Sequence, residues 1–178
     1  SAEKGLEVWK KTSPWKRSVI IRKIADLIRA KQDVLAKWIT LEVGKPFIEA
    51  KGEVGATADI FEWNSEETKR IYGQTVESRF EDTRIHVYYQ PIGVVAAMSP
   101  WNFPLVLSGR KISTALAAGC SVIIKPDVIA PGGVMELVDI CREAGVPPGV
   151  VNLLSGDPPS IASQLISSDI IKKISITG

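Results

Sequence analysis

The sequence contains one histidine and two cysteines among its 178 residues. A Ser-His-Asp triad needs a histidine beside the nucleophile, and a zinc site needs several Cys or His ligands at short spacings. His86 stands alone, and Cys120 and Cys141 lie in apolar stretches without a CxxC pair. Both kinds of site are therefore disfavoured, and the sparse use of cysteine favours a reducing, cytoplasmic setting.

The chain also lacks an excess of either charge and any long apolar run. Its 22 Lys and Arg residues against 20 Asp and Glu residues give a formal net charge of +2. There is no basic stripe of the kind that neutralises phosphates, so nucleic acid is not an expected partner. No apolar run approaches the roughly 20 residues of a membrane-spanning helix, and residues 1–16 do not resemble a secretory signal. We therefore expect a folded, soluble protein with no membrane partner.

The N-terminal part of the chain predicts helices. Ser13 is a suitable N-cap for a helix that extends to about residue 43, with Asp33 as the cap of a second segment within it. The sequence Gly44-Lys45-Pro46 predicts the end of this helix, because glycine adopts the left-handed conformation and proline cannot continue the helix. A third helix is predicted from about residue 47 to residue 71.

The rest of the chain predicts strands and helices in alternation. Apolar and polar residues alternate over residues 84–90, which is typical of a strand with one buried face. Further strands are predicted at 93–98, 121–124, 150–154 and 171–176, with helices at 105–118, 133–144 and 160–167. Continuous apolar strands separated by helices predict an α/β fold with a Rossmann-like parallel sheet and helices on both faces, preceded by the N-terminal helices.

Ligands of an open parallel sheet bind beyond the carboxyl ends of its strands. The residues at these positions are 99–104, 125–127, 155–159 and 177–178. Asn102 can donate a hydrogen bond to a developing oxyanion, Lys125 can bind a ribose hydroxyl or a phosphate, and the helix after Gly156 can accept an anion. This pattern indicates a nucleotide site beside an electrophilic centre, and it predicts that the three residues surround one pocket.

An ordinary structural role is the alternative for the same residues. Glycine and proline after strands are common turn residues, an asparagine beside a proline often only forms a turn, and a lysine after a strand is usually solvated. From spacing alone this alternative is favoured by roughly two to one. The dinucleotide fingerprint GxGxxG is also absent, so a nucleotide would bind without the usual phosphate-cradling loop.

Several short phrases, in this order and spacing, resemble the aldehyde dehydrogenase superfamily. They are Ser99-Pro-Trp-Asn-Phe-Pro104, Ala115-Leu-Ala-Ala-Gly-Cys120, Ile124-Lys-Pro126, Ala144-Gly-Val-Pro147, Val151-Asn152 and Ile176-Thr-Gly178. The resemblance extends to the N-terminal half through Leu41-Glu-Val-Gly-Lys-Pro46, Glu62-Trp63 and Arg70-Ile-Tyr-Gly73. Within the superfamily these phrases look most like the branch of the succinate-semialdehyde dehydrogenases.

The resemblance implies roles for individual residues. Asn102 would be the oxyanion-hole amide, and Lys111 would lie near the active site. Lys125 would hydrogen-bond the adenosine ribose, and Gly156, Thr177 and Gly178 would contact the pyrophosphate and nicotinamide side. The full set implied to bind the cofactor is Met98, Ser99, Pro100, Trp101, Lys125, Asp127, Val128, Gly156, Thr177 and Gly178.

The resemblance also implies an organisation into parts. Residues 1–75 would be helices of the cofactor-binding domain, residues 76–90 a β arm that pairs subunits, and residues 91–178 an incomplete Rossmann-like core that binds NAD or NADP. The implied substrate is a small-molecule aldehyde, for example succinate semialdehyde, which is oxidised to a carboxylic acid. The arm implies a homo-oligomer in the complete protein.

Some residues depart from the family pattern. Val128 stands where many NAD-preferring members have Glu and some NADP users have Ser, and Pro158 and Ala162 stand where glycines are frequent. The Glu-Leu-Gly-Gly phrase with the general base and the Gly-Gln-x-Cys phrase with the nucleophile occur nowhere in the chain. Cys120 and Cys141 are expected to be small buried residues instead.

Only Thr177 and Gly178 follow the last predicted strand, with no further helix, so we expect a truncated aldehyde dehydrogenase fold. The chain alone is then expected to be inactive, since it lacks the nucleophile and the base. An alternative is a short non-catalytic protein that keeps the fold as a nucleotide-binding or interaction module. Acyl-phosphate reductases share the scaffold, but the Pro-Trp-Asn-Phe-Pro phrase matches aldehyde oxidation better.

Overall fold

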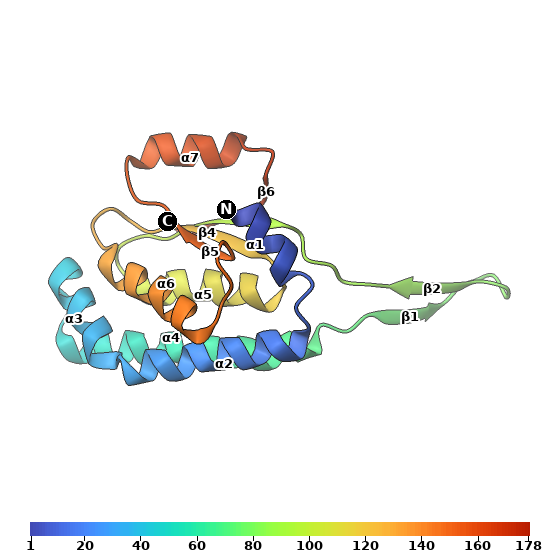
Figure 1. Ribbon diagram of the computed structural model, residues 1–178, viewed down its shortest axis with the longest axis horizontal. Helices are drawn as coiled ribbons and strands as arrows, with labels where there is room; N and C mark the ends of the chain where they lie inside the picture. Colours follow the sequence, from blue (N-terminus) through green and yellow to red (C-terminus); the bar gives the residue numbers. More distant parts are fainter.

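The computed structural model describes all residues from 1 to 178. Its elements in chain order are α1 (Ala2–Trp9), α2 (Pro14–Ala30), α3 (Gln32–Val43), α4 (Phe47–Glu67), a 3-10 turn (Thr68–Arg70), β1 (Gln74–Glu77), β2 (Arg84–Val87), β3 (Val94–Met98), α5 (Pro104–Ala117), β4 (Ser121–Lys125), α6 (Gly132–Ala144), β5 (Val151–Leu153), α7 (Pro158–Ser167) and β6 (Ile171–Ile176). Layers of helices lie on both sides of a central sheet, and a β hairpin extends away from them (Figure 1). None of the helices combines the length and the apolar character needed to cross a membrane.

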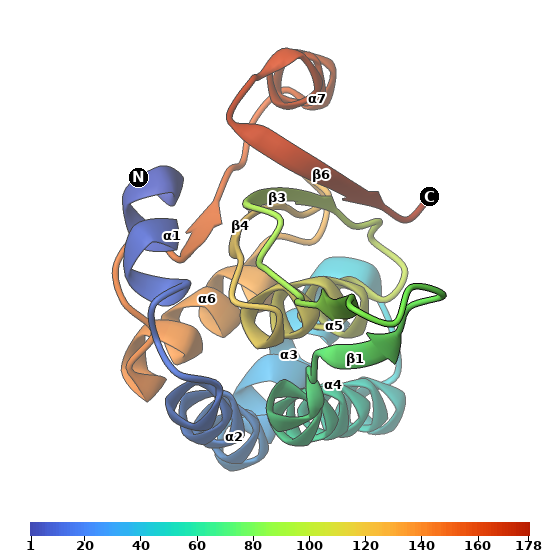
Figure 2. The same cartoon turned by 90° about the vertical axis from the view of Figure 1, so that its right-hand side faces the viewer.

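The four strands of the central sheet run parallel in the order β5-β4-β3-β6. The register places Met98 of β3 beside Lys125 of β4 and beside Ile176 of β6, so these strands end at a common edge. Helices α5 and α6 pack on one face of the sheet, and α1 and α7 lie on the other (Figure 2). The predicted α/β fold, with a parallel sheet and helices on both faces, is confirmed.

The N-terminal helices differ from the prediction at their junctions. Ser13 caps α2 as predicted, because its Oγ accepts the Lys16 N–H at 3.3 Å. The long predicted helix is two helices that break at Lys31, and Asp33 lies in the first turn of α3 rather than at its cap. That part of the prediction is wrong because Lys31 itself takes the non-helical conformation (φ −100°, ψ 20°). Gly44 ends α3 in the left-handed conformation (φ 75°), as predicted.

The sequence analysis predicts no helix before residue 13, whereas the structure has α1 there. Trp9, at the end of this helix, is fully buried, and its indole N–H donates to the Leu116 carbonyl at 2.9 Å. An eight-residue helix is marginal in water. Burial of a large aromatic side chain whose N–H is paired therefore anchors α1 to the end of α5.

The two faces of the sheet are buried unequally. On the α5 side, 29 buried residues form one core between the sheet and the helices. On the α7 side the buried cluster holds only Ala96, Met98 and Leu165, and Ile176 of β6 is 69% exposed. Since hydrophobic stabilisation grows with the apolar area removed from water, most of it comes from the α5 side.

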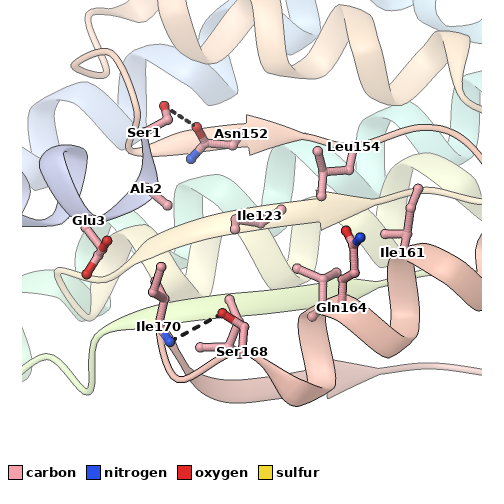
Figure 3. Close-up of a pocket in the computed structure, with 12 residues that line it drawn as sticks. Ser1, Ala2, Glu3, Ile123, Asn152, Leu154, Ile161, Gln164, Ser168 and Ile170 are labelled. Carbon is pink, nitrogen blue, oxygen red and sulfur yellow. Dashed lines mark hydrogen bonds between the residues drawn. The ribbon is translucent and has the colours of Figure 1, made fainter.

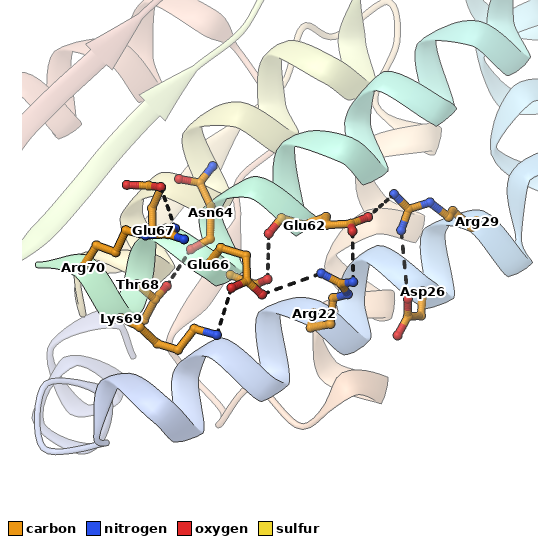
Figure 4. A network of polar contacts seen from close by, with 11 residues as sticks. Arg22, Asp26, Arg29, Glu62, Asn64, Glu66, Glu67, Thr68, Lys69 and Arg70 are labelled. Atoms are coloured by element: carbon orange, nitrogen blue, oxygen red, sulfur yellow. Dashed lines mark hydrogen bonds and ion pairs between the residues drawn. The ribbon is translucent and has the colours of Figure 1, made fainter.

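Ion pairs on the surface join α2 to α4 (Figure 4). Arg22 contacts Glu62 at 2.9 Å, and Arg29 contacts both Asp59, at 2.9 Å, and Glu62. Arg22 also approaches Glu66 at 3.8 Å. Exposed pairs of this kind contribute little individually, about 0–1 kcal/mol. Because Glu62 is shared by two arginines of α2, the network mainly fixes how the two helices are aligned.

Strands β1 and β2 form an antiparallel hairpin that extends from the body of the chain (Figure 1). The prediction that this strand buries one face is wrong for this chain, since Ile85 is 46% exposed and Tyr89 is also exposed. The alternation of apolar residues correctly indicates a strand. No other element of the chain lies against the hairpin to cover its apolar side.

Helices α4 and α5 approach closely at Gly109. A Cβ atom there would lie 2.7 Å from Thr57 Cγ2 and 3.3 Å from Phe61 Cε2. We predict that Gly109→Ala lowers the free energy of unfolding, because overpacking costs about 1–3 kcal/mol and outweighs the gain of about 1 kcal/mol in helix propensity.

Gly52, on the exposed side of α4, is the matched control because nothing lies within 4 Å of its added Cβ. Gly52→Ala should raise the free energy of unfolding by up to ~1 kcal/mol. Urea unfolding of both variants measures the difference. Equal stabilisation by the two substitutions would show that α4 and α5 do not pack at Gly109 as described.

Candidate functional site

The carboxyl ends of the strands are held together by main-chain hydrogen bonds. The N–H of Ser99 donates to the Lys125 carbonyl at 3.3 Å, and the N–H of Thr177 donates to the Met98 carbonyl at 3.2 Å. The N–H of Leu154 donates to the Ile124 carbonyl at 3.0 Å. The residues that follow the carboxyl ends of the strands therefore lie along one edge of the sheet, as a parallel arrangement requires.

The turn between β3 and α5 carries the candidate oxyanion donor. Asn102 is exposed, and its Oδ1 accepts the Phe103 N–H at 3.1 Å. Its carbonyl accepts a hydrogen bond from the Lys45 ammonium at 3.0 Å. The side-chain Nδ2 has no partner in the chain, so the amide N–H groups are free to donate at the edge. Ser99, in contrast, is buried, and its Oγ lies 2.6 Å from Ser108 Oγ of α5.

The start of α5 depends on a side chain from α4. The residue before α5 is Phe103, which has no capping group. Glu53 is buried, and its Oε1 accepts the N–H groups of Leu105 at 2.9 Å and Val106 at 3.2 Å. Its Oε2 accepts a hydrogen bond from Lys45. Lys45 and Glu53 are not among the predicted site residues, because the groups that they contact lie more than 50 residues away along the chain.

Helix α6 begins in the same way. Pro131 precedes it and offers no side-chain acceptor. Glu42 of α3 accepts the Gly132 N–H with Oε1 at 2.7 Å and the Gly133 N–H with Oε2 at 3.5 Å. Two glutamates of the N-terminal helices thus hold the starts of α5 and α6 at the carboxyl edge.

Lys125 lies at the end of β4 with little exposure. Its ammonium donates to the Pro126 carbonyl at 3.2 Å and has no carboxylate partner. Strand alternation places it on the α7 side of the sheet, the side of Ile123 and Met98. Asp127 forms a turn in which Oδ1 accepts the Ile129 N–H at 3.1 Å.

The other predicted cofactor residues differ in their surroundings. Pro100 is half-buried, and Trp101 and Val128 are exposed. Gly156 is exposed, with a φ of 147° that favours glycine. Asp157 caps α7, since its Oδ2 accepts the Ser160 N–H at 3.0 Å.

Lys111 joins α5 to β6 on the other side of the sheet. Its ammonium donates to Thr177 Oγ1 at 2.7 Å and to Ser175 Oγ at 3.3 Å. Burial lowers the pKa of Lys111, and the charge of Arg110 lowers it further. Gly178 follows Thr177 in the open. A hollow of about 230 Å³ adjoins this region, and its cationic lining residues are Arg110, Lys111 and Lys173, with no carboxylate among the lining residues.

The structure thus brings the predicted residues to one edge but to two sides of the sheet. Lys125 and Met98 face α7, whereas Lys111 lies on the α5 side. That Asn102, Lys125 and Gly156 surround a single pocket stays a prediction. A separate hollow of about 400 Å³ lies between α1 and α7 (Figure 3), and its only ionisable side chain is that of Glu3.

Neither cysteine is placed to act as a nucleophile at this edge. Cys120 is 2% exposed and Cys141 is 1% exposed, as expected. Burial raises the pKa of Cys141 to about 12. Cys120 lines the hollow beside Lys111, but it precedes β4, whose five residues put it roughly 16 Å from the carboxyl edge.

Comparison with known proteins gives consistent matches. Residues 1–178 match the model of the aldehyde dehydrogenase family. The succinate semialdehyde dehydrogenase of Acinetobacter baylyi (strain ATCC 33305 / BD413 / ADP1) is 45% identical over 172 residues, which are 97% of this chain and 36% of that protein. The succinate-semialdehyde dehydrogenase [NADP(+)] of Escherichia coli (strain K12) is 42% identical over 178 residues, which are 100% of this chain and 37% of that protein.

A solved structure agrees with these matches. The crystal structure of succinate-semialdehyde dehydrogenase from Burkholderia pseudomallei is similar with a TM-score of 0.98 and 40% identity, over 99% of this chain and 37% of that one. The chain therefore spans somewhat more than a third of the length of the curated relatives that it matches.

We predict that Lys111 loses its proton at a lower pH than a solvated lysine does, because burial disfavours the ammonium and Arg110 repels it. Lys31 is the matched control, since Glu143 and Glu136 raise its pKa. An NMR titration of the lysine side chains should show Lys111 titrating before Lys31, and the reverse order would contradict the placement of Lys111.

The lowered pKa of Lys111 makes the free energy of unfolding depend on pH. The pKa of Lys111 is lower in the folded chain than in the unfolded one, so its charge opposes folding at neutral pH. The free energy of unfolding therefore rises as the pH increases from the folded-state pKa of Lys111 towards its unfolded-state pKa, because Lys111 loses the charge that opposes folding.

Proposed function

The chain belongs to the aldehyde dehydrogenase family, and from this we propose that it is the cofactor-binding part of an enzyme that oxidises an aldehyde with NAD or NADP. The observation that carries the proposal is the free Asn102 amide at the carboxyl edge, whose Oδ1 and carbonyl are both held in place. An oxyanion forms when a nucleophile adds to an aldehyde, and a fixed, unpaired N–H donor stabilises it. Asn102 supplies such a donor.

The side chains at the edge fit a nucleotide cofactor. Lys125 is a nearly buried ammonium without a carboxylate partner, which fits a ribose hydroxyl or a phosphate. Thr177, whose hydroxyl accepts from Lys111, fits the reactive end. The bound NAD or NADP would accept the hydride that leaves the aldehyde carbon. The chain's own residues bind and orient the cofactor and the carbonyl oxygen.

The substrate we propose is a semialdehyde that carries a carboxylate. Two of the similar proteins are named as succinate-semialdehyde dehydrogenases. In this chain the Lys111 ammonium reaches Thr177 at the carboxyl edge and has no carboxylate partner. A small aldehyde with an anionic far end matches this unpaired cation.

Catalysis needs groups that this chain does not place at the edge. Covalent aldehyde oxidation requires a thiolate near Asn102 and a base for the hydrolytic water. Since both cysteines are buried away from the edge, the chain alone is proposed to bind cofactor without turnover. A short non-catalytic module with the same fold is the second candidate, and the intact mass of the protein from its source separates the two.

The hairpin is proposed to pair with a second copy of the chain. Its apolar residues Val76 and Ile85 are exposed, and no element of the same chain covers them. On this view residues 76–90 are the assembly arm, residues 1–75 the helices of the cofactor-binding domain, and residues 91–178 its Rossmann-like core.

We predict that the 178-residue chain binds NAD or NADP and that Lys125→Met weakens this binding by about 10- to 100-fold, because a hydrogen bond to a charged group contributes about 1.5–3 kcal/mol. Calorimetric titration or quenching of the exposed Trp101 measures the affinity. Lys172→Met is the matched control, since this lysine of β6 is exposed and donates to the Asp169 carbonyl. Unchanged affinity in Lys125→Met would contradict the proposal, and so would NAD(P)H formation from succinate semialdehyde by the chain alone.

Val128 bears on the choice between NAD and NADP. It is exposed in the loop after Lys125, and it can neither accept from a ribose hydroxyl nor bind a phosphate. Discrimination between the cofactors should be weak, and Val128→Glu should shift it towards NAD by about 1–3 kcal/mol through a new hydrogen bond and repulsion of the 2′-phosphate. Val128→Gln tests the hydrogen bond without the charge. The measurement is the ratio of the affinities for NAD and NADP in each variant. An unchanged ratio in Val128→Glu would contradict the prediction.

A further inference from the structure

Lys45 and Glu53 form a buried ion pair beneath the turn that carries Asn102. The two side chains are only 10% and 1% exposed. Lys45 follows the end of α3, and Glu53 lies in the second turn of α4, so both come from outside the sheet. Apart from each other, their partners lie in the turn between β3 and α5 and in the first turn of α5.

The pair makes two contacts with that turn and two with the first turn of α5. Glu53 Oε1 accepts the N–H groups of Leu105 at 2.9 Å and Val106 at 3.2 Å. The Lys45 ammonium donates to the Asn102 carbonyl at 3.0 Å and lies 3.7 Å from the centre of the Phe103 ring. The ammonium and the carboxylate therefore join one end of α4 to consecutive residues at the start of α5.

Capping of α5 alone does not require this arrangement. Ser13 caps α2 and Asp157 caps α7 from the ordinary position before each helix. A buried ion pair gains little stability over apolar packing, because both charges lose their hydration. What Lys45 adds beyond a cap is a fixed position for the Asn102 carbonyl relative to α4.

The fixed carbonyl determines which group of Asn102 remains available. Lys45 occupies the main-chain oxygen, and the Phe103 N–H occupies Oδ1. Of the side-chain amide, only Nδ2 is left without a partner in the chain, and Asn102 is exposed. A donor to an oxyanion acts best when it is held in place before the reaction begins.

We propose that Lys45 and Glu53 are positioning residues that hold Asn102 with its Nδ2 free at the carboxyl edge. This role rests on the proposed function of Asn102 as the oxyanion donor. Glu53 keeps the ammonium in place and fixes the first turn of α5, while Lys45 transmits that position to Asn102.

The test is an NMR comparison of variants of the 178-residue chain. In Lys45→Met the alkyl stem is kept and the ammonium is lost, and we expect the Asn102 side-chain amide signals to shift and to report more than one conformation. Lys45→Arg should restore a single set of signals, because the guanidinium can reach the same carboxylate and carbonyl. Lys51→Met is the matched control, since Lys51 is also a lysine of this region, paired with Asp33 at 2.9 Å and 5.7 Å from the Phe47 ring. It should leave the Asn102 signals unchanged.

A double variant guards against loss of folding. Lys45→Met leaves Glu53 as a buried unpaired charge, whereas Lys45→Met with Glu53→Gln removes that charge and keeps an oxygen for the Leu105 and Val106 N–H groups. In the double variant the hydrogen exchange of these two amides should stay within about 3-fold of the parent chain. The Asn102 signals should still be displaced.

Unchanged Asn102 signals in a folded Lys45→Met or in the double variant would overturn the proposal. This NMR test can be distinguished from the test of the proposed function, because the Asn102 signals are measured without a cofactor. If the chain fails to bind NAD or NADP but Asn102 still responds to Lys45, the proposed function fails and the positioning contact stands.

Discussion

Helices α5 and α6 begin at the carboxyl edge of the sheet without capping side chains of their own, and the structure of that edge depends on two glutamates that replace them. Glu53 accepts two N–H groups of α5, and Glu42 accepts two of α6. A buried N–H group without a partner costs about 1–3 kcal/mol. The four hydrogen bonds therefore tie both helix starts, and the turns before them, to α3 and α4.

This dependence explains why the N-terminal helices are part of the site although they lie outside the sheet. Helices α2, α3 and α4 share one continuous core with α5, α6 and the sheet. Gly109 lets α4 and α5 approach until the added volume of a single methyl group would collide with Thr57. Close packing keeps Glu53 at a fixed distance from the start of α5, and the polar contacts then transmit that position to Asn102.

The sequence predicts the sheet well and the long-range contacts poorly, for physical reasons. The predicted strand at 93–98 matches β3, whose five residues are all buried, because buried parallel strands are continuous apolar runs. Helix α1 was missed, because Trp9 stabilises it through a contact with Leu116 that no local pattern shows. The alternation in the hairpin indicates a strand but not what covers it. Asn102 and Lys125 follow predicted strands and also lie in phrases that resemble the family, so the sequence singles them out. Glu53 and Lys45 contact partners more than 50 residues away, so neither spacing nor propensity reveals them.

The glutamates also affect how a phosphate group can bind at this edge. Helix starts usually attract anions through their free N–H groups and the helix dipole. Here the starts of α5, α6 and α7 are each occupied by a carboxylate, from Glu53, Glu42 and Asp157 respectively. A phosphate at this edge therefore meets a carboxylate at every helix start, and the sequence has no GxGxxG loop to offer instead. Of the nearby cations, Lys45 is paired with Glu53, whereas Lys125 has no carboxylate partner. If a dinucleotide binds at this edge, its attraction on the α7 side then rests on the Lys125 ammonium rather than on a helix dipole.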